Sequence, residues 1–333
     1  MNLIFSFLTL CADFTNLSAE LNQSQTAPFN ESHVDQSFQR AQIGFQERWH
    51  NFAGNASHFP LWTKGWGEDE LTERFDRMVR CRWAVYFTNY EDRQKENVLG
   101  LYREAYQTPE NWESWGSRYP YPGAFAYNLA TPSYNASLIS LHGLRFIALE
   151  APTAENLNAF FRVIHDYNIS PLVRLTRAYE KRENSFPYWI CRTENTVDLS
   201  QTTLKIENQK LDYFSIEDWS DHQGYEPKRL LALVKAVKNT TLSNSIVGVH
   251  CRAGAGRTGT FIAAYVLVHD IDQQIASGVD IDHLEISIDK IFWELSLQRP
   301  FSVTHYQQYR SLYQLVDYYT NVLRSLISFS KVF

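Results

Sequence analysis

The chain has 333 residues, of which 44% are hydrophobic and 20% charged, a composition typical of a soluble globular protein with a full hydrophobic core. Its formal net charge of −6 argues against general affinity for nucleic acids or anionic membranes. The cysteines show neither the paired spacing of a disulfide framework nor that of metal ligands, so they suit a reducing compartment. They are Cys11, Cys81, Cys191 and Cys251.

The N-terminal residues 1–34 are expected to form a flexible lead-in. Residues 1–12 are largely apolar, but no lysine or arginine precedes the apolar run, which is too short to span a bilayer. A loosely attached arm therefore fits them better than a secretion signal. Residues 13–34 are rich in Asn, Gln, Ser and Thr, which is typical of flexible sequence.

Hydrophobic spacing predicts two helices, 36–49 and 70–85, as a helical cap over about 35–104. Beyond this helical cap, strands alternate with helices. Pro152 or Thr153 is expected to form the N-terminal cap of the helix at 156–164. The expected strands are 145–149, 171–177, 211–216 and 246–250, and the expected helices are 156–164, 228–238, 257–267, 283–297 and 307–326. This alternation indicates an α/β fold.

The chemistry is concentrated in the phosphate loop, residues 251–257, which joins an apolar strand to an apolar helix. Gly254 and Gly256 let backbone N–H groups turn inward, so that the loop and the helix N-terminus form a socket for a tetrahedral oxyanion. Cys251 lies at the mouth of that socket, in a field that favours its thiolate. Arg257 can hold two phosphate oxygens at once. The pattern predicts a cysteine nucleophile acting on a phosphate ester.

The phosphate loop resembles the Cys-(any five)-Arg signature of the protein tyrosine phosphatases, in the longer form His-Cys-x-Ala-Gly-x-Gly-Arg-Thr-Gly. The resemblance implies a twisted mixed central sheet flanked by helices, within one catalytic domain (35–333) whose family-like core covers about 105–325. It also implies hydrolysis of phosphotyrosine in proteins through a cysteinyl-phosphate intermediate, without a metal or cofactor. The loop residues expected to hold the phosphate are Arg252, Ala253, Gly254, Ala255 and Gly256.

Cleavage of a phosphate ester needs a proton on the leaving oxygen, which a carboxylic acid on a closing loop can supply. The family uses Trp-Pro-Asp some thirty residues before the cysteine, and this chain has Trp219-Ser220-Asp221. The resemblance makes Asp221 the general acid, with Asp218 and Glu217 as alternatives. We call residues 217–224 the acid loop. Because the missing proline removes a fixed φ, closure of this loop is expected to be slower or less populated.

Supporting roles also follow from the resemblance. The Thr258 hydroxyl would hydrogen-bond the sulfur of the nucleophile. His250 is expected to be buried and to orient the loop rather than transfer protons. Glu180 would pair with Arg257 and hold its guanidinium in place, although a surface position in a charged turn is the alternative for this carboxylate.

The segment Gln298-Arg299-Pro300 and the residues after it resemble the family's Gln-Arg-Pro, three residues, Gln-Thr, two residues, Gln-Tyr. In that alignment Gln308 matches the second glutamine and would help Asp221, acting as a base, to deliver water to the phosphoenzyme. Thr304 stands where the first, water-orienting glutamine belongs. The alternative for Gln308 is an ordinary position on a helix surface.

The aromatic segment 109–119 resembles the family stretch that runs from Pro-Glu-Asn to Asn-Arg-Tyr. By this resemblance Tyr119 would stack on the substrate's phosphotyrosine and set the depth of the pocket. A rival placement around 95–99 leaves no tyrosine at the stacking position, and an aromatic loop packed on the domain is a further alternative. Tyr121 stands where the family has an aspartate that binds the substrate backbone.

Two other functions stay open. A phosphoinositide phosphatase shares the same loop but usually carries extra cations in it, of which this chain supplies Arg252 alone. A non-catalytic phosphotyrosine-binding module would lose Cys251, Arg257 or the acid, and all three are present.

The start of the loop, His-Cys-Arg-Ala-Gly, is also similar to that of the tyrosine phosphatase that Yersinia delivers into host cells. Together with the polar lead-in, it leads to the hypothesis of a secreted bacterial effector that acts on phosphotyrosine proteins in the host cytosol. The alternative is a resident cytoplasmic phosphatase. We expect a monomer in either case.

Overall fold

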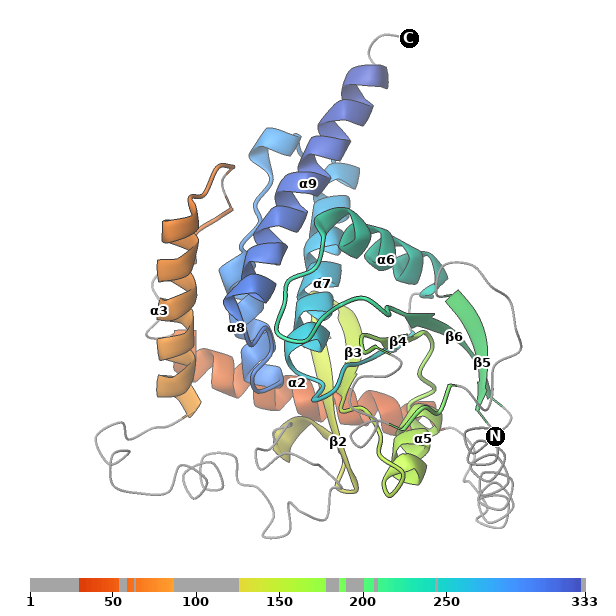
Figure 1. Cartoon of the computed structure of the whole chain (residues 1–333). Coiled ribbons are helices and arrows are strands. Elements are labelled where there is room, and N and C mark those ends of the chain that lie inside the picture. The colour runs from red at the N-terminus through yellow and green to blue at the C-terminus, as the bar shows by residue number, and fades with distance from the viewer. Residues whose placement is uncertain are drawn as a thin grey trace, which may run out of the picture.

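The computed structural model describes residues 30–53, 59–62, 64–86, 126–177, 186–189, 201–206, 209–242 and 245–330. In this part of the chain, helices cover both faces of a seven-stranded sheet (Figure 1). The strands are β1 (Leu129–Thr131), β2 (Tyr134–Leu141), β3 (Leu144–Leu149), β4 (Leu172–Arg174), β5 (Gln201–Ile206), β6 (Gln209–Ser215) and β7 (Val247–His250).

The sheet is mixed, with the order β1-β2-β3-β7-β4-β6-β5. The neighbours of β7, β3 and β4, both run parallel to it, and β4 runs parallel to β6. The outer pairs β1–β2, β2–β3 and β5–β6 are antiparallel. The predicted α/β fold with a mixed central sheet is therefore confirmed, and its central strand is the one that leads into the phosphate loop.

The helices of the described residues are α2 (Glu31–Ala53), α3 (Glu68–Tyr86), α5 (Leu157–Asp166), α6 (Pro227–Thr240), α7 (Gly256–Ala276), α8 (Ile288–Gln298) and α9 (Tyr306–Ser330). The short 3₁₀ turns η3 (Ala126–Asn128) and η5 (Ile281–His283) join them. No helix among the described residues is long and apolar enough to cross a membrane.

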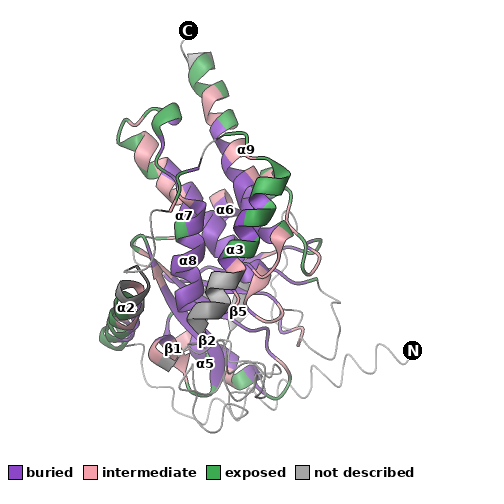
Figure 2. Ribbon diagram, turned by 90° about the vertical axis from the view of Figure 1, so that its left-hand side faces the viewer, coloured by how far each residue is buried: buried purple, intermediate pink, exposed green. Residues whose placement is uncertain are grey.

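The side chains of β3 alternate between two hydrophobic clusters. Phe146 and Ala148 pack with residues of α3, α6, α7, α8 and α9, whereas Ile147 and Leu149 pack with residues of α2 and α5. Because both faces are covered, the central strands are mostly apolar, and the buried polar residues Arg174 and His250 stand at the ends of β4 and β7. Figure 2 shows the buried residues gathered in the sheet and the lower turns of α7, α8 and α9, with the far end of α9 exposed.

Helix α2 begins within the predicted lead-in, at Glu31. Asn30 precedes it and its side-chain oxygen accepts a hydrogen bond from the backbone N–H of His33 (3.1 Å), which is a helix N-cap. Gly44 lies inside α2, where the ring of Tyr127 packs directly against it. A Cβ at this position would lie 2.5 Å from the nearest ring atom of Tyr127, so a larger residue would collide with the ring. The glycine therefore serves close packing rather than a break in the helix.

Other boundaries differ from the sequence-based ones. α8 starts at Ile288, not 283, because Ser287 caps it by accepting a hydrogen bond from the N–H of Lys290. The residue before α5 is Asn156, not Pro152 or Thr153. The predicted strand 171–177 is ordered as a strand only over β4, and the hairpin partner β5 was not predicted.

Helix α3 is anchored to the body by a buried cation. Arg74 forms an ion pair with Asp289 of α8, and the carboxylate of Asp289 also accepts hydrogen bonds from Tyr309 and Tyr313 of α9. The guanidinium lies over the ring of Trp66, 3.9 Å from its centroid. Removing one partner of such a buried pair typically costs about 3 to 5 kcal/mol. The part of the expected cap beyond Tyr86 lies outside the described residues.

His142, in the turn between β2 and β3, makes the fold sensitive to pH. Its ring contacts Asp270 of α7 (2.7 Å) and Glu294 of α8 (3.0 Å). These two hydrogen bonds, opposed by burial, raise the pKa of His142 from 6.5 to about 9. The stabilisation is therefore fully present below about pH 6.5 and is lost as the pH rises through about 9.

We predict that His142→Asn, which tolerates the positive φ of 49° at this position, lowers the free energy of unfolding by about 1 to 2 kcal/mol near pH 6 and by much less near pH 10. Urea unfolding of both proteins across this pH range measures the difference. His283→Asn is the matched control, since His283 is exposed and lies 4.0 Å from its aspartate. A difference that does not depend on pH contradicts the prediction.

Candidate active site

The phosphate loop follows β7 directly and ends where α7 begins. Gly254 has φ +67°, and a Cβ there would lie 2.1 Å from the backbone oxygen of Leu149, so no larger residue fits. A Cβ on Gly256 would lie 2.8 Å from the Nε2 atom of Gln308. The first glycine thus allows the turn, and the second leaves room for a side chain from α9.

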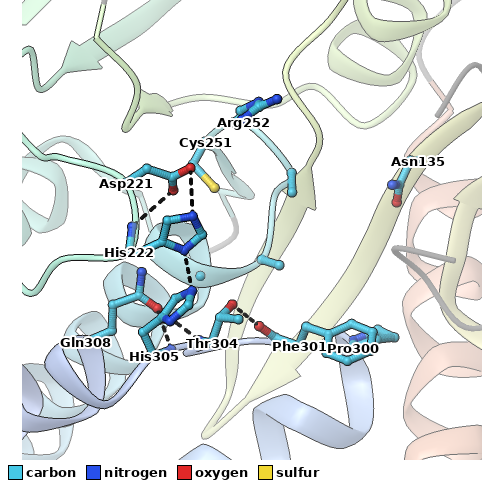
Figure 3. A pocket seen from close by; sticks show the side chains of 13 residues that line it. Asn135, Asp221, His222, Cys251, Arg252, Pro300, Phe301, Thr304, His305 and Gln308 are labelled. Atoms are coloured by element: carbon cyan, nitrogen blue, oxygen red, sulfur yellow. Dashed lines mark hydrogen bonds and ion pairs between the residues drawn. The ribbon is translucent and has the colours of Figure 1, made fainter. Parts of the chain in front are cut away.

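Cys251 is 3% exposed and lies at the base of a cavity of about 330 Å³ (Figure 3). Five elements contribute to the walls: the phosphate loop, the acid loop, β2, the segment 300–305 and the first turn of α9. The residues that line the cavity besides Cys251 are Asn135, Asp221, His222, Arg252, Ala253, Ala255, Gly256, Pro300, Phe301, Thr304, His305 and Gln308. The structure therefore brings the predicted nucleophile, acid and water-directing residue into one space.

A buried arginine shapes the loop from outside the cavity. Arg299 donates from Nε to the carbonyl oxygen of Gly254 (2.9 Å) and from Nη2 to that of Ala253 (3.1 Å). Its Nη1 donates to Asn135 and Ser137 of β2. The N–H and C=O of a trans peptide point to opposite sides, so holding these carbonyls directs the following N–H groups away from Arg299.

Burial lowers the pKa of Arg299 to about 10, while Glu150 and Cys251 act in the opposite direction. The side chain therefore still carries its positive charge at neutral pH. The resemblance of Gln298-Arg299-Pro300 to the family motif indicates no role for this arginine. Its partners lie more than 40 positions away along the chain, so no local pattern shows them.

His250 lies behind the loop and is fully buried. Its Nε2 is hydrogen-bonded to the hydroxyl of Tyr188 (2.6 Å), and its Nδ1 lies 3.3 Å from the carbonyl oxygen of Cys251. Burial raises the pKa of Tyr188, which keeps its hydroxyl protonated. These contacts support the expected role of His250 in orienting the loop.

Arg257 joins the phosphate loop to the acid loop. Its guanidinium is completely buried; Nη1 donates to the backbone oxygen of Trp219 (3.0 Å) and Nη2 pairs with Oδ1 of Asp221 (3.1 Å). Trp219 is itself buried, donates to the carbonyl of Gln223 and stacks on Tyr225 with 4.7 Å between centroids. The acid loop is therefore closed over the cavity, with Asp221 at its edge.

The two alternative acids point elsewhere. Asp218 pairs with Arg229 of α6 and accepts a hydrogen bond from the Tyr225 hydroxyl. Glu217 pairs with the buried Arg174 of β4. Neither carboxylate lines the cavity, so the geometry favours Asp221 as the acid.

Ser220 takes the place of the family's proline and accepts a hydrogen bond from Nη2 of Arg177 (2.5 Å). The closed loop thus has a side-chain contact at the position where proline would restrict the backbone. Slower closure of this loop stays a prediction.

Gln308 uses its amide oxygen within the protein. Oε1 accepts hydrogen bonds from the backbone N–H groups of Thr304 (2.9 Å) and His305 (3.2 Å), at the start of α9. Both ends of the amide lie beside Gly256, because a Cβ there would be 2.8 Å from Nε2 and 2.9 Å from Oε1. The hydroxyl of Thr304 donates to the carbonyl of Phe301 (2.7 Å). Gln308 therefore offers the cavity its amide N–H groups.

Some expected site residues receive no such support. The Thr258 hydroxyl is fully buried and has no hydrogen-bond partner among the described residues, so its bond to the sulfur stays a prediction. Tyr119, Tyr121 and Glu180 lie outside the described residues. In the described part of the chain, no group of three or more His, Cys, Asp or Glu side chains could hold a metal ion.

Comparison with known proteins places this geometry in a family. A family model described as protein-tyrosine phosphatase matches residues 128–212 and 192–318, which together cover more than half of the 333 residues. The chain belongs to the protein-tyrosine phosphatase family. The resemblance inferred from the phosphate loop is thereby confirmed.

Its relatives include human receptor-type tyrosine-protein phosphatase epsilon, which is 28% identical over 232 residues, covering 60% of this chain and 32% of the relative. Tyrosine-protein phosphatase 2 of Dictyostelium discoideum is 27% identical over 208 residues, covering 55% of this chain and 53% of the relative. The chain thus spans about a third of the human receptor-type relative and about half of the Dictyostelium protein.

The fold is also similar to the crystal structure of the Trypanosoma cruzi protein tyrosine phosphatase TcPTP1, with a TM-score of 0.57 and 20% identity. That similarity covers 78% of this chain and 96% of the other. It supports a shared fold for the tyrosine phosphatase domain.

Sequence analysis assigns no functional role to several residues at the cavity. His222 and His305 face each other across its wall, and Phe301 lies in its lining with φ +60°, an uncommon conformation for a bulky side chain. Asn135 of β2 also lines it. The positive φ of Phe301 follows from the turn between α8 and α9, which hydrophobic periodicity does not describe.

We predict that Gln308→Ala slows hydrolysis of the phosphoenzyme about tenfold or more while changing its formation less, because the amide N–H groups next to Gly256 are lost. Burst kinetics that show accumulation of the phosphoenzyme would support this.

Gln308→Glu separates the two ends of the amide, because a carboxylate still accepts hydrogen bonds from the N–H groups of Thr304 and His305 but donates none to the cavity. We expect it to share the kinetic defect of Gln308→Ala and, because Gln308 is 1% exposed, to lower thermal stability somewhat through the buried charge. Normal phosphoenzyme hydrolysis in the Glu variant would contradict a role for the N–H groups.

Proposed function

We propose that this chain is a phosphatase that hydrolyses phosphotyrosine in proteins through a phosphate ester of Cys251. The observation that carries the proposal is the single cavity in which the Cys251 sulfur, the phosphate-loop backbone and the Asp221 carboxylate meet, with the buried Arg257 joining the two loops. The names of the relatives support the same activity.

In the first step, the thiolate of Cys251 attacks phosphorus in line with the leaving tyrosine oxygen. The loop N–H groups and Arg257 hold the three equatorial oxygens as charge redistributes. The P–O bond breaks, its electron pair stays on the phenolic oxygen, and Asp221 supplies the proton that makes tyrosine a good leaving group.

In the second step, water attacks the phosphorus of the cysteinyl phosphate. The S–P bond breaks and its electron pair returns to the Cys251 sulfur. The proton of the water passes to the Asp221 carboxylate, which restores the protonated acid for the next cycle. Gln308 assists by donating hydrogen bonds from its amide nitrogen toward the reacting phosphate and water.

Arg257 changes partner during this cycle. Its guanidinium pairs with Asp221 in the structure, and a bound phosphate dianion competes for the same N–H groups. When the phosphate takes them, the Asp221 carboxylate loses its cation and can carry the proton that the first step requires.

We predict that Cys251→Ser, which keeps the shape of the side chain, lowers turnover of a phosphotyrosine peptide at least about a thousandfold without lowering thermal stability. Assays with the wild type on phosphotyrosine peptides and on phosphoinositides decide the substrate class, and we expect the peptide to be preferred. Substantial activity in the Ser variant would contradict the assignment of the nucleophile. A preference for phosphoinositides would favour the lipid phosphatase alternative.

A finer proposal concerns where the enzyme acts. Arg252 in the cavity lining and the polar lead-in support a secreted bacterial effector that acts in a host cell as a monomeric, single catalytic domain. A translocation reporter fused to the full chain, expressed in the source organism in contact with host cells, tests this. A signal confined to the producing cell would support a resident phosphatase instead.

A further inference from the structure

Two histidines join the acid loop to the helix on the other side of the cavity. Nδ1 of His222 is hydrogen-bonded to Nε2 of His305, the residue before α9. The rings meet edge to face, with 4.1 Å between centroids and an angle of 83°. Figure 3 shows both rings in line with Asp221 along the wall beside Cys251. The contact therefore spans from the general acid to α9.

The acid loop end of this contact is constrained. His222 has φ +65°, which few residues other than glycine adopt without cost, so its backbone needs support from its surroundings. Its Nε2 lies 3.5 Å from Oδ2 of Asp221, and its own N–H donates to Oδ1 of the same carboxylate (3.2 Å). A contact that fixes the position of the His222 ring therefore also orients the Asp221 carboxylate.

The α9 end is fixed. The backbone N–H of His305 donates to Oε1 of Gln308, which ties it to the first turn of the helix. Burial, reinforced by His222 and opposed by Asp221, lowers the pKa of His305, so its ring is neutral near pH 7 and leaves one ring nitrogen to accept or donate as the contact requires.

A second contact places the same loop against the same turn. A Cβ on Gly224 would lie 2.4 Å from the carbonyl oxygen of Gln307 and 3.3 Å from the side chain of Ser311. The acid loop therefore contacts the start of α9 through both His222 and Gly224, and it packs against this turn in the closed state.

We propose that His305 is a positioning residue for the general acid: by bonding His222 it keeps Asp221 over the cavity once the substrate has taken Arg257 away from it. The inference rests on the proposed function. In the structure Arg257 alone could orient the carboxylate, but a bound phosphate competes for that guanidinium. The contacts that remain closest to the carboxylate are then the Arg257 bond to the carbonyl of Trp219 and the pair of histidines, while Glu217, Asp218 and Ser220 keep their arginine partners.

The kinetic test uses leaving groups of different quality. We expect His305→Ala to lower kcat/KM for a phosphotyrosine peptide about tenfold and for an aryl phosphate with a strongly acidic phenol less than about twofold, since only the former needs the proton. Asp221→Ala sets the full size of this selective loss. His305→Gln, which can still bond an imidazole, should recover most of the rate.

Two further variants separate positioning from a merely structural role. In the double variant His222→Ala/His305→Ala, the loss should equal that of His222→Ala alone, because the contact between the two histidines is already lost when the His222 ring is removed. His165→Ala is the matched control, since His165 also contacts an adjacent aspartate, Asp166, but lines no part of the cavity. An equal loss with both leaving groups, or additive losses, would overturn the proposal.

A structural measurement does not depend on activity. Hydrogen exchange of the amides in the acid loop should be faster in His305→Ala than in the wild type, with exchange in α7 unchanged; an unchanged acid loop overturns the proposal. If the wild type hydrolyses neither substrate, the proposed function fails, and the exchange experiment still decides whether the histidines hold the loop.

Discussion

A single buried cation organises the site. The guanidinium of Arg257 is fully inaccessible to solvent, and a buried charge without a partner is strongly unfavourable. In the closed structure the partners are the carbonyl of Trp219 and the carboxylate of Asp221, and in catalysis a phosphate would replace the carboxylate. In the proposed mechanism the same requirement accounts for the closed acid loop, for substrate binding and for the release of Asp221 for proton transfer.

A second buried arginine, Arg299, orients the backbone of the phosphate loop. Arg299 occupies carbonyl oxygens of the phosphate loop from behind, so that the peptide N–H groups are available on the opposite side. Gly254 makes this backbone shape possible, since a side chain there would collide with Leu149. The socket for the oxyanion thus depends on two distant parts of the chain, β7 with its loop and the end of α8.

The start of α9 is where these parts meet. Gln308 caps the turn with its amide oxygen, its amide group lies beside Gly256, and His305 in the same turn contacts the acid loop. The sequence predicted this helix, and it pointed to Gln308 because that residue aligns with the second glutamine of the family motif. It could not show that the oxygen of this amide is already used, because that depends on the path of residues 301–305.

The same distinction explains the rest of the comparison between sequence and structure. Cys251, Arg257 and Asp221 could be proposed from the sequence because their chemistry requires specific residue types at short spacing or on a recognisable loop, and the structure brings them together. Sequence analysis assigns no role to Arg299 or His305, because the contacts from which we infer their roles are made with partners far away in the chain. The start of α8 was placed too early for a local reason, since apolar residues before Ser287 continue the helical spacing although Ser287 caps the helix.

The acid loop of this chain is held by side chains rather than by a rigid backbone. Consecutive residues from Glu217 to His222 each contact a group outside the loop, and four of those groups are arginines. The partners are Arg174, Arg229, Arg257, Arg177 and His305. A proline would restrict the φ angle of one residue, whereas Ser220 adds a side-chain contact with Arg177 in the closed loop. With Ser220 in place of proline, the closed loop is therefore held by charged side chains of β4, of the segment after it, of α6 and of the phosphate loop rather than by a fixed φ.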